Sequence, residues 1–208
     1  MKIIDGLKLP ADKNGLTEIP DCSRDDLPQF FLERGYKVGA EIGTSKGVYA
    51  ETICKAGLKL YAIDPWISYD DYYGGTEKFQ KKMDRVYEDA KKLLTPYDCV
   101  IIKKTSMDAL ADIPDESLDF VYIDANHDFM YVAQDLFEWS KKVKKGGVIS
   151  GHDYFYSQYR TYDAIHVKYV VDAYVKAFKI KQWYVIGRKE KIEGEVRDRP
   201  RSFFWIKQ

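Results

Sequence analysis

The sequence predicts an α/β protein built on a Rossmann-like, doubly wound and mostly parallel sheet with an antiparallel C-terminal strand. Beyond about residue 36, short apolar runs alternate with longer segments of helical periodicity, as in strands joined by crossover helices. The segment EIGTSKG combines a strand end, a glycine turn and a helix start. Two late β-rich runs, Trp183–Ile186 and Phe203–Ile206, flank a charged stretch and favour an antiparallel pair.

The length favours a single domain, because 208 residues suffice for one substantial core and are too few to expect two. Residues 1–36 carry scattered turn formers and a weak helical pattern at Leu27–Leu32. We therefore expect residues 1–36 to be a lead-in packed on the domain that residues 37–208 form.

The first predicted unit is a strand, a turn and a helix. The strand is Val38–Ile42, the turn runs from Gly43 to Gly47, and the helix begins at Val48 and can be capped by Gly57. The chain then returns as a second strand at Leu58–Ile63.

The middle of the chain repeats this alternation. A charged helix is predicted at Glu77–Leu94, where Pro96 stops it, and a third strand follows at Cys99–Ile102. A turn of helix is expected after Ser106, and Leu118–Ile123 is the fourth strand.

The next helix is predicted from an apolar stripe and from two glycines, Gly146 and Gly147, at its end. The stripe consists of Phe129, Val132, Leu136, Trp139 and Val143. The fifth strand is predicted at Val148–Ser150, followed by a helix near His166–Phe178.

Composition disfavours several classes of protein. Lysine plus arginine and aspartate plus glutamate both number 33, so no global field gathers nucleic acid. No apolar run approaches the roughly 20 residues of a membrane span, and the three distant cysteines show no zinc or disulfide spacing. We expect a soluble cytoplasmic chain with a small-molecule partner, and a homo-oligomer is left open.

The glycine turn predicts a nucleotide-type cofactor site at the carboxyl end of the sheet, where backbone amides and a helix dipole meet. Glu41 at the tip of the first strand would oppose a pyrophosphate, whereas S-adenosylmethionine carries an ammonium and a sulfonium and no phosphate. Asp64, roughly 20 residues on, suits the ribose of either cofactor. A nicotinamide oxidoreductase remains an alternative, disfavoured by Glu41 and by the missing GxGxxG spacing.

Residues Val38 to Tyr154 resemble a class I S-adenosylmethionine-dependent methyltransferase. The matching stretches, in order, are EIGTSKG, YAIDPW, SLDFVYIDANH and KKGGVISGHDY. Within that superfamily, the run that begins IDANHDFMYVAQDLFEW is most similar to the group of macrolide-sugar O-methyltransferases and the cephamycin biosynthesis protein CmcI.

The resemblance implies which residues bind the cofactor. The turn with Glu41 would contact the methionine portion, Asp64 the ribose, and Ser106 with Met107 the adenine rim. Ser45 stands where many family members have glycine, which changes how closely the backbone can approach. The full expected set is Glu41, Gly43, Thr44, Ser45, Gly47, Asp64, Ser106, Met107 and Asp124.

A second cluster is expected where the fourth and fifth strands end. Asp124 follows one strand, and His152 with Asp153 follows its expected neighbour, so the three side chains should converge. Asp124 and Asp153 suit a divalent ion such as Mg²⁺, and His152 completes the predicted metal set. The resembled metal-dependent members commonly carry a carboxylate at His152, and an imidazole suits manganese, iron or zinc better than magnesium.

Methyl transfer to oxygen needs a base or a metal, because a hydroxyl is a poor nucleophile while it keeps its proton. His127 is the expected base, since its unperturbed pKa near 6.5 leaves it largely neutral, and Asp124 is the second expected catalytic residue. The resemblance implies the same role for a histidine at this offset. In the alternative interpretation, Asp124 only caps the next helix, and His152 with Asp153 only stabilises a loop.

The sequence therefore predicts a methyltransferase that uses S-adenosylmethionine, and a divalent metal, to methylate a hydroxyl of a small molecule or sugar. Two alternatives stay open. One is methylation of nitrogen or of a macromolecule without a metal. The other is a non-catalytic module that binds S-adenosylmethionine.

Overall fold

A computed structural model describes residues 2–68, 76–156 and 165–208. Its strands are β1 (Leu16–Ile19), β2 (Val38–Ile42), β3 (Lys59–Ile63), β4 (Cys99–Ile102), β5 (Leu118–Ile123), β6 (Val143–Gly151), β7 (Trp183–Ile186) and β8 (Phe203–Ile206). Its helices are α1 (Ile3–Gly6), α2 (Leu27–Glu33), α3 (Val48–Lys55), α5 (Glu77–Leu94), α6 (Ser106–Ala109), α7 (Phe129–Lys142) and α8 (Val167–Ala177). Short 3-10 turns lie at Arg24–Asp26 and Leu110–Asp112. None of the helices in these ranges has both the length and the apolar character to cross a membrane.

The described strands form one sheet of eight in the order β1-β7-β8-β6-β5-β2-β3-β4. Strand β2 pairs in parallel with β3 and β5, and β5 pairs in parallel with β6. Strand β8 is antiparallel to both β6 and β7, between which it lies. The predicted doubly wound, mostly parallel sheet with an antiparallel C-terminal strand is confirmed, and the carboxyl ends of β2, β3, β5 and β6 share one edge.

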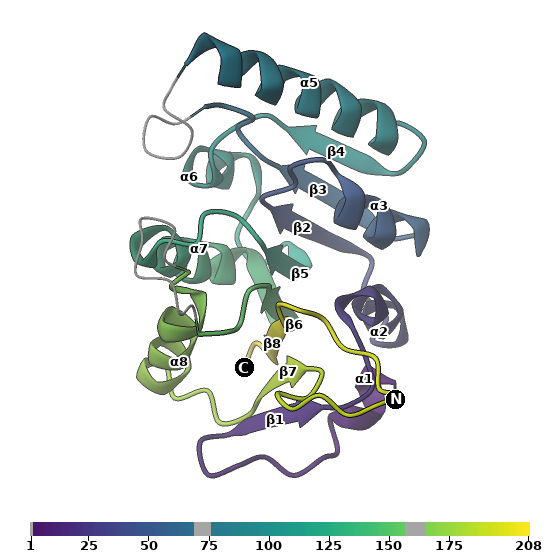
Figure 1. Cartoon of the computed structure of the whole chain (residues 1–208), viewed down its shortest axis with the longest axis vertical. Coiled ribbons are helices and arrows are strands. Elements are labelled where there is room, and N and C mark those ends of the chain that lie inside the picture. The colour runs from purple at the N-terminus through teal and green to yellow at the C-terminus, as the bar shows by residue number, and fades with distance from the viewer. Residues whose placement is uncertain (1, 69–75, 157–164) are drawn as a thin grey trace.

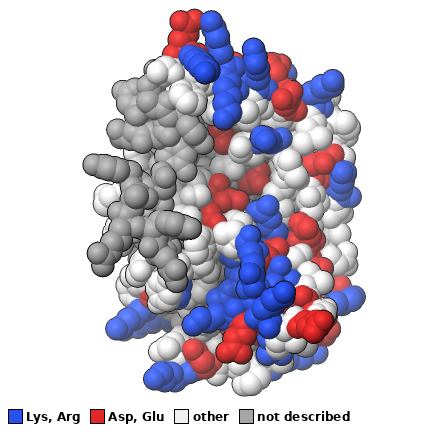
Figure 2. Space-filling model, in the orientation of Figure 1, with Lys and Arg blue, Asp and Glu red and all other residues white. Residues whose placement is uncertain are grey.

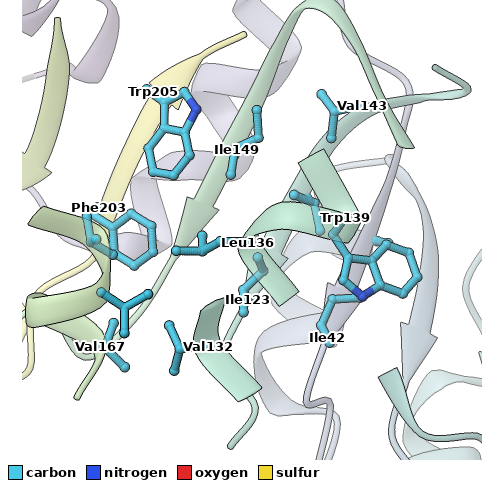
Figure 3. Packing of buried hydrophobic residues seen from close by; sticks show 14 of the residues in the cluster. Ile42, Ile123, Val132, Leu136, Trp139, Val143, Ile149, Val167, Phe203 and Trp205 are labelled. Atoms are coloured by element: carbon cyan, nitrogen blue, oxygen red, sulfur yellow. The ribbon is translucent and has the colours of Figure 1, made fainter. Parts of the chain in front are cut away.

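Helices cover both faces of the sheet, with α7 and α8 on one side and α2 on the other (Figure 1). The alternation of side chains along a strand sends neighbouring residues into two different cores. In β5, Val121 belongs to the core under α7 and α8, and Phe120 to the core under α2 and α3. Figure 3 shows the first core, in which helix and strand residues meet: Ile42, Ile123, Val132, Leu136, Trp139 and Ile149.

One predicted helix end is wrong. The helix was expected to continue through Val143 to the glycine pair, but α7 ends at Lys142 and Val143 begins β6. Val143 has extended backbone, is fully buried and pairs with Leu118. A buried valine fits the apolar stripe of a helix and the first position of a strand equally well, so periodicity alone could not distinguish them.

The N-terminal segment contributes more than the expected lead-in. The predicted helical pattern at Leu27–Leu32 is present as α2, but β1 was not anticipated. Strand β1 pairs in parallel with β7, with Leu16 opposite Trp183. The short run LTEI has little strand signal of its own, and its conformation depends on this pairing with a strand more than 160 residues later.

Candidate active site

The glycine turn after β2 is fixed between the ends of two neighbouring strands. Gly43 has a φ of +93°, and a Cβ atom there would lie 2.1 Å from the carbonyl oxygen of Asp124. The backbone N–H groups of Gly43 and Thr44 donate to the carbonyl of Ile63, at 2.8 and 3.2 Å. Only glycine allows this close approach, so the turn lies against the carboxyl ends of β3 and β5.

Ser45 occupies a backbone conformation that favours glycine, with a φ of +48°. Two contacts hold it there. Its N–H donates to Oδ2 of Asp64 at 2.9 Å, and its carbonyl accepts from the indole N–H of Trp66 at 2.9 Å. The departure from glycine noted in the sequence is therefore compensated by a buried tryptophan from the YAIDPW motif, whose role we did not predict.

Asp64 lies where the sequence placed it, after β3 and beside the turn. Its Oδ1 atom accepts from the N–H of Trp66 at 2.8 Å, and its Oδ2 atom from Ser45. Burial raises the pKa of this carboxyl above its ordinary value, although both backbone hydrogen bonds act in the opposite direction. Each carboxylate oxygen accepts more than one hydrogen bond, so Asp64 keeps capacity for hydroxyl donors.

Glu41 is almost completely buried at 2% exposure. Among the described residues, its Oε2 atom has no hydrogen-bond partner, and the same holds for the hydroxyl of Thr44. Burial raises the pKa of Glu41 well above its ordinary value, the neighbouring Thr44 hydroxyl opposes this shift, and the charge of Asp124 adds to it. Unpaired buried polar atoms are rare because they cost free energy, so this pair favours a site completed by a polar ligand.

The predicted metal set comes together at the ends of β5 and β6. One ligand atom from each of Asp124, His152 and Asp153 lies within 4.8 Å of the other two. Nδ1 of His152 is 3.8 Å from Oδ2 of Asp124 and 3.4 Å from Oδ1 of Asp153. Asp153 is buried and has a φ of +59°, a conformation that costs free energy and that is frequent at functional sites. Two carboxylates and one imidazole fit a divalent cation.

His127 lies next to the same carboxylates. Its Nε2 atom is 2.7 Å from Oδ2 of Asp153 and 3.9 Å from Oδ1 of Asp124, without the alignment of a hydrogen bond. Burial alone would lower its pKa, but the two carboxylates outweigh burial and raise the pKa of His127 to about 9. The structure therefore differs from the neutral imidazole expected from the sequence, because that expectation did not include the combined effect of Asp124 and Asp153 on His127.

Ser106 is engaged with helix α7. Its hydroxyl donates to Oδ1 of Asp135 and accepts from the indole N–H of Trp139 at 2.8 Å. Asp135 is buried, which raises its pKa to about 6. Met107 is half-buried and packs against the core under α7. The contact with Asp135 was not predicted, and the role of Ser106 and Met107 at an adenine rim stays a prediction.

Arg24 is the main site residue that sequence reasoning missed. It lies in the 3-10 turn before α2, and its guanidinium approaches Oδ2 of Asp124 at 3.3 Å. The guanidinium carbon is 4.8 Å from the ring centre of Tyr49, whose hydroxyl donates to the carbonyl of Arg24 at 2.9 Å. No local motif marks an arginine that meets its partner 100 residues later in the chain.

Comparison with protein families gives one matching model. Residues 39–154, more than half of the chain, match the family Methyltransf_24, described as a methyltransferase domain. A curated relative, the uncharacterized protein y4gI of Sinorhizobium fredii, is 28% identical over 123 residues. The aligned part is 54% of this chain and 12% of that protein, so the chain spans only a small part of this relative.

Several solved structures share the fold. A candidate caffeoyl-CoA O-methyltransferase from Staphylococcus aureus aligns with a TM-score of 0.60 at 17% identity, over 88% of this chain and 82% of that one. An O-methyltransferase from Bacillus cereus in complex with SAH has a TM-score of 0.56 at 14% identity, over 86% and 77%. The O-methyltransferase TomG from Streptomyces achromogenes in complex with SAM has a TM-score of 0.57 at 12% identity, over 88% and 79%.

Proposed function

Since the chain belongs to the Methyltransf_24 family of methyltransferase domains, we propose that it transfers the methyl group of S-adenosylmethionine to a hydroxyl of a small molecule or sugar. The observation that carries this proposal is the position of two groups of side chains at one sheet edge. Glu41, Thr44 and Asp64 form a cofactor cradle beside the glycine turn. Asp124, His127 and Asp153 form an acid–base cluster at the neighbouring strand ends.

The cradle suits the donor chemically. An ammonium group supplies N–H donors to acceptor oxygens that lack partners, which are Oε2 of Glu41 and the hydroxyl of Thr44. Ribose hydroxyls can donate to the carboxylate of Asp64, and S-adenosylmethionine has no phosphate that the acidic side chains near the turn would repel. These features support S-adenosylmethionine over a dinucleotide.

The ligand set at the strand ends suits a divalent cation, Mg²⁺ or Mn²⁺, held by Asp124, His152 and Asp153. A bound ion of this kind would supply Lewis acidity toward the acceptor hydroxyl. Asp153 also positions the imidazole of His127, because its carboxylate contacts the Nε2 atom.

In the proposed reaction, the acceptor oxygen attacks the methyl carbon in line with the carbon–sulfur bond. That bond breaks, its electron pair stays on sulfur, and S-adenosylhomocysteine leaves. The neutral imidazole of His127 takes the proton from the acceptor hydroxyl, and Asp153 stabilises the imidazolium that results. The raised pKa of His127 makes it a strong base once it has lost its own proton.

A second candidate function is favoured by the same histidine. With a pKa of about 9, His127 holds its proton near neutral pH in the absence of a metal. An amine acceptor needs no such base, because its neutral form attacks directly. Methylation of nitrogen without a metal is therefore the alternative, and the strand-end acids would then orient the amine.

The test measures S-adenosylhomocysteine release with panels of hydroxyl and amine acceptors, in EDTA and after addition of Mg²⁺ or Mn²⁺. The proposal predicts turnover with a hydroxyl acceptor that EDTA abolishes and a divalent ion restores. Asp153→Asn should lower turnover at least ~100-fold, whereas Asp115→Asn, at an exposed surface ion pair, should leave it unchanged. Amine-only turnover in EDTA would support the alternative, and binding without any turnover would indicate a non-catalytic module.

A further inference from the structure

The cofactor cradle is acidic, so it would repel the carboxylate group of the proposed ligand. Glu41, Asp64, Asp124 and Asp153 all lie at the shared strand edge, and acidic side chains gather near the middle of this face between groups of lysine and arginine (Figure 2). S-adenosylmethionine carries an ammonium and a sulfonium, which suit such a site, but also a carboxylate. A carboxylate next to other carboxylates is repelled unless a cation lies between them.

Arg24 brings a permanent positive charge to this edge. Its guanidinium is within 3.3 Å of Asp124, the residue whose carbonyl packs against Gly43 of the turn. The arginine therefore lies beside the expected binding position of the methionine portion. The guanidinium carbon of Arg24 lies 4.8 Å from the ring centre of Tyr49. Burial alone would lower the pKa of Arg24, but Tyr122, Asp124 and Tyr49 outweigh burial and keep the side chain in its charged form.

The backbone of Arg24 is held firmly. Its N–H donates to Oδ2 of Asp198 and its carbonyl accepts from Tyr49. Ser23 begins the turn with a capping box, in which its hydroxyl and the carboxylate of Asp26 bond reciprocally to backbone N–H groups. Such preorganisation lowers the entropic cost of binding a ligand with the side chain.

The guanidinium keeps donor capacity for a ligand. It carries five N–H donors, and the contact with Asp124 involves only the Nη1 end. The side chain of Arg24 is 31% exposed, so part of it can be reached from outside. Arginine and a carboxylate form paired, charge-assisted hydrogen bonds with matching geometry.

We propose that Arg24 binds the carboxylate of the methionine portion of S-adenosylmethionine, so that the N-terminal segment completes the cofactor site. This inference rests on the proposed function, because it names the contact for one group of the proposed donor. Glu41 and Thr44 then serve the ammonium and Arg24 the carboxylate. The two charged ends of the amino acid moiety are recognised by opposite charges.

The experiment compares S-adenosylmethionine with decarboxylated S-adenosylmethionine, which lacks only the carboxylate. Isothermal titration of the full chain should show tighter binding of the complete ligand, although the decarboxylated one carries more positive charge. Arg24→Gln should weaken binding of the complete ligand by roughly 10- to 100-fold, as expected for a charged hydrogen bond, and leave the decarboxylated one nearly unchanged. Arg24→Lys should fall in between, because it keeps the charge and loses the paired geometry.

Each other outcome overturns the inference in a distinct way. Equal weakening of both ligands by Arg24→Gln means that Arg24 only organises the N-terminal segment. No weakening of either means that Arg24 is only a counter-charge for Asp124. The matched control is Arg34→Gln, because Arg34 is an exposed arginine beside Tyr36. Thermal unfolding checks that each variant is folded. If the unmodified chain binds neither ligand, the proposed function itself fails.

Discussion

Nε2 of His127 lies 2.7 Å from Oδ2 of Asp153, although the two residues follow different strands of the sheet. The contact contributes to opposite shifts of the two pKa values, together with Asp124 beside His127 and His152 beside Asp153. The pKa of His127 rises to about 9, and that of Asp153 falls well below its ordinary value, even though burial opposes both changes. The two side chains therefore form an imidazolium–carboxylate ion pair, and removing either one should shift the pKa of the other.

Asp153→Asn should lower the pKa of His127 from about 9 toward its ordinary value, because one of its two carboxylates is lost. NMR titration of the imidazole signals in the metal-free protein measures this, with the His127 signal assigned by His127→Gln. Methyl transfer should fall at least ~100-fold in the same variant, the usual contribution of acid–base residues. An unchanged His127 titration would show that the contact does not form in solution.

The stability that His127 contributes should depend on pH. Its pKa is about 9 in the folded protein and near 6.5 when unfolded, so the folded state binds the extra proton. The contribution is complete below pH 6.5 and is lost as the pH rises through 9. Urea unfolding in EDTA should show the free-energy difference between the unmodified chain and His127→Gln shrinking over this range by up to about 3 kcal/mol. A constant difference would contradict the raised pKa.

Asp135→Asn should stabilise the protein at neutral pH. Burial raises the pKa of Asp135 from 3.8 to about 6, so the folded state favours the protonated carboxyl. Stability is therefore highest below pH 4 for this group and is lost as the pH rises through 6. Two pKa units correspond to about 3 kcal/mol at most, and an asparagine still offers an oxygen to Ser106. Urea unfolding at pH 4 and pH 8 tests this against Asp89→Asn, at an exposed position of α5.

Gly43→Ala and Gly146→Ala separate steric overlap from backbone strain. Both glycines have positive φ, +93° and +78°, but a Cβ at Gly43 meets the carbonyl of Asp124 at 2.1 Å, whereas a Cβ at Gly146 meets nothing within 4 Å. Gly146→Ala should cost about 1 kcal/mol of unfolding free energy from strain alone. Gly43→Ala should cost several times more and abolish binding of S-adenosylmethionine. Equal costs would indicate that the turn does not pack tightly against β5.

Local signals in the sequence were sufficient for most of the fold. Strand and helix periodicities placed β2, α5, β4 and β5 with the bounds that the structure has. The convergence of Asp124, His152 and Asp153 was also predictable, because carboxyl ends of neighbouring parallel strands meet at one edge. Features that are set within one helix or strand, or between adjacent parallel strands, could be predicted from the order of residues in the sequence.

Features that depend on distant contacts could not be inferred. Strand β1 takes its conformation from β7, and Arg24 reaches Asp124 from a turn with no motif of its own. The raised pKa of His127 follows from its position beside the carboxylates of Asp124 and Asp153, and spacing along the chain does not set the approach to Asp153. Side-chain charge and register between distant segments are properties of the folded chain.

The reversed direction of β8 brings the chain back to the reactive edge once more. Because Phe203 pairs with Gly151, the connection between β7 and β8 finishes beside the residues that follow β6, and the carbonyl of Arg201 accepts from the N–H of Tyr154. This connection therefore lies next to the candidate active site but is not part of a strand of the sheet. Because Asp198 in this connection also binds the backbone N–H of Arg24, changes in its length or charge can alter access to the reactive groups and the position of Arg24 while the strand register stays intact.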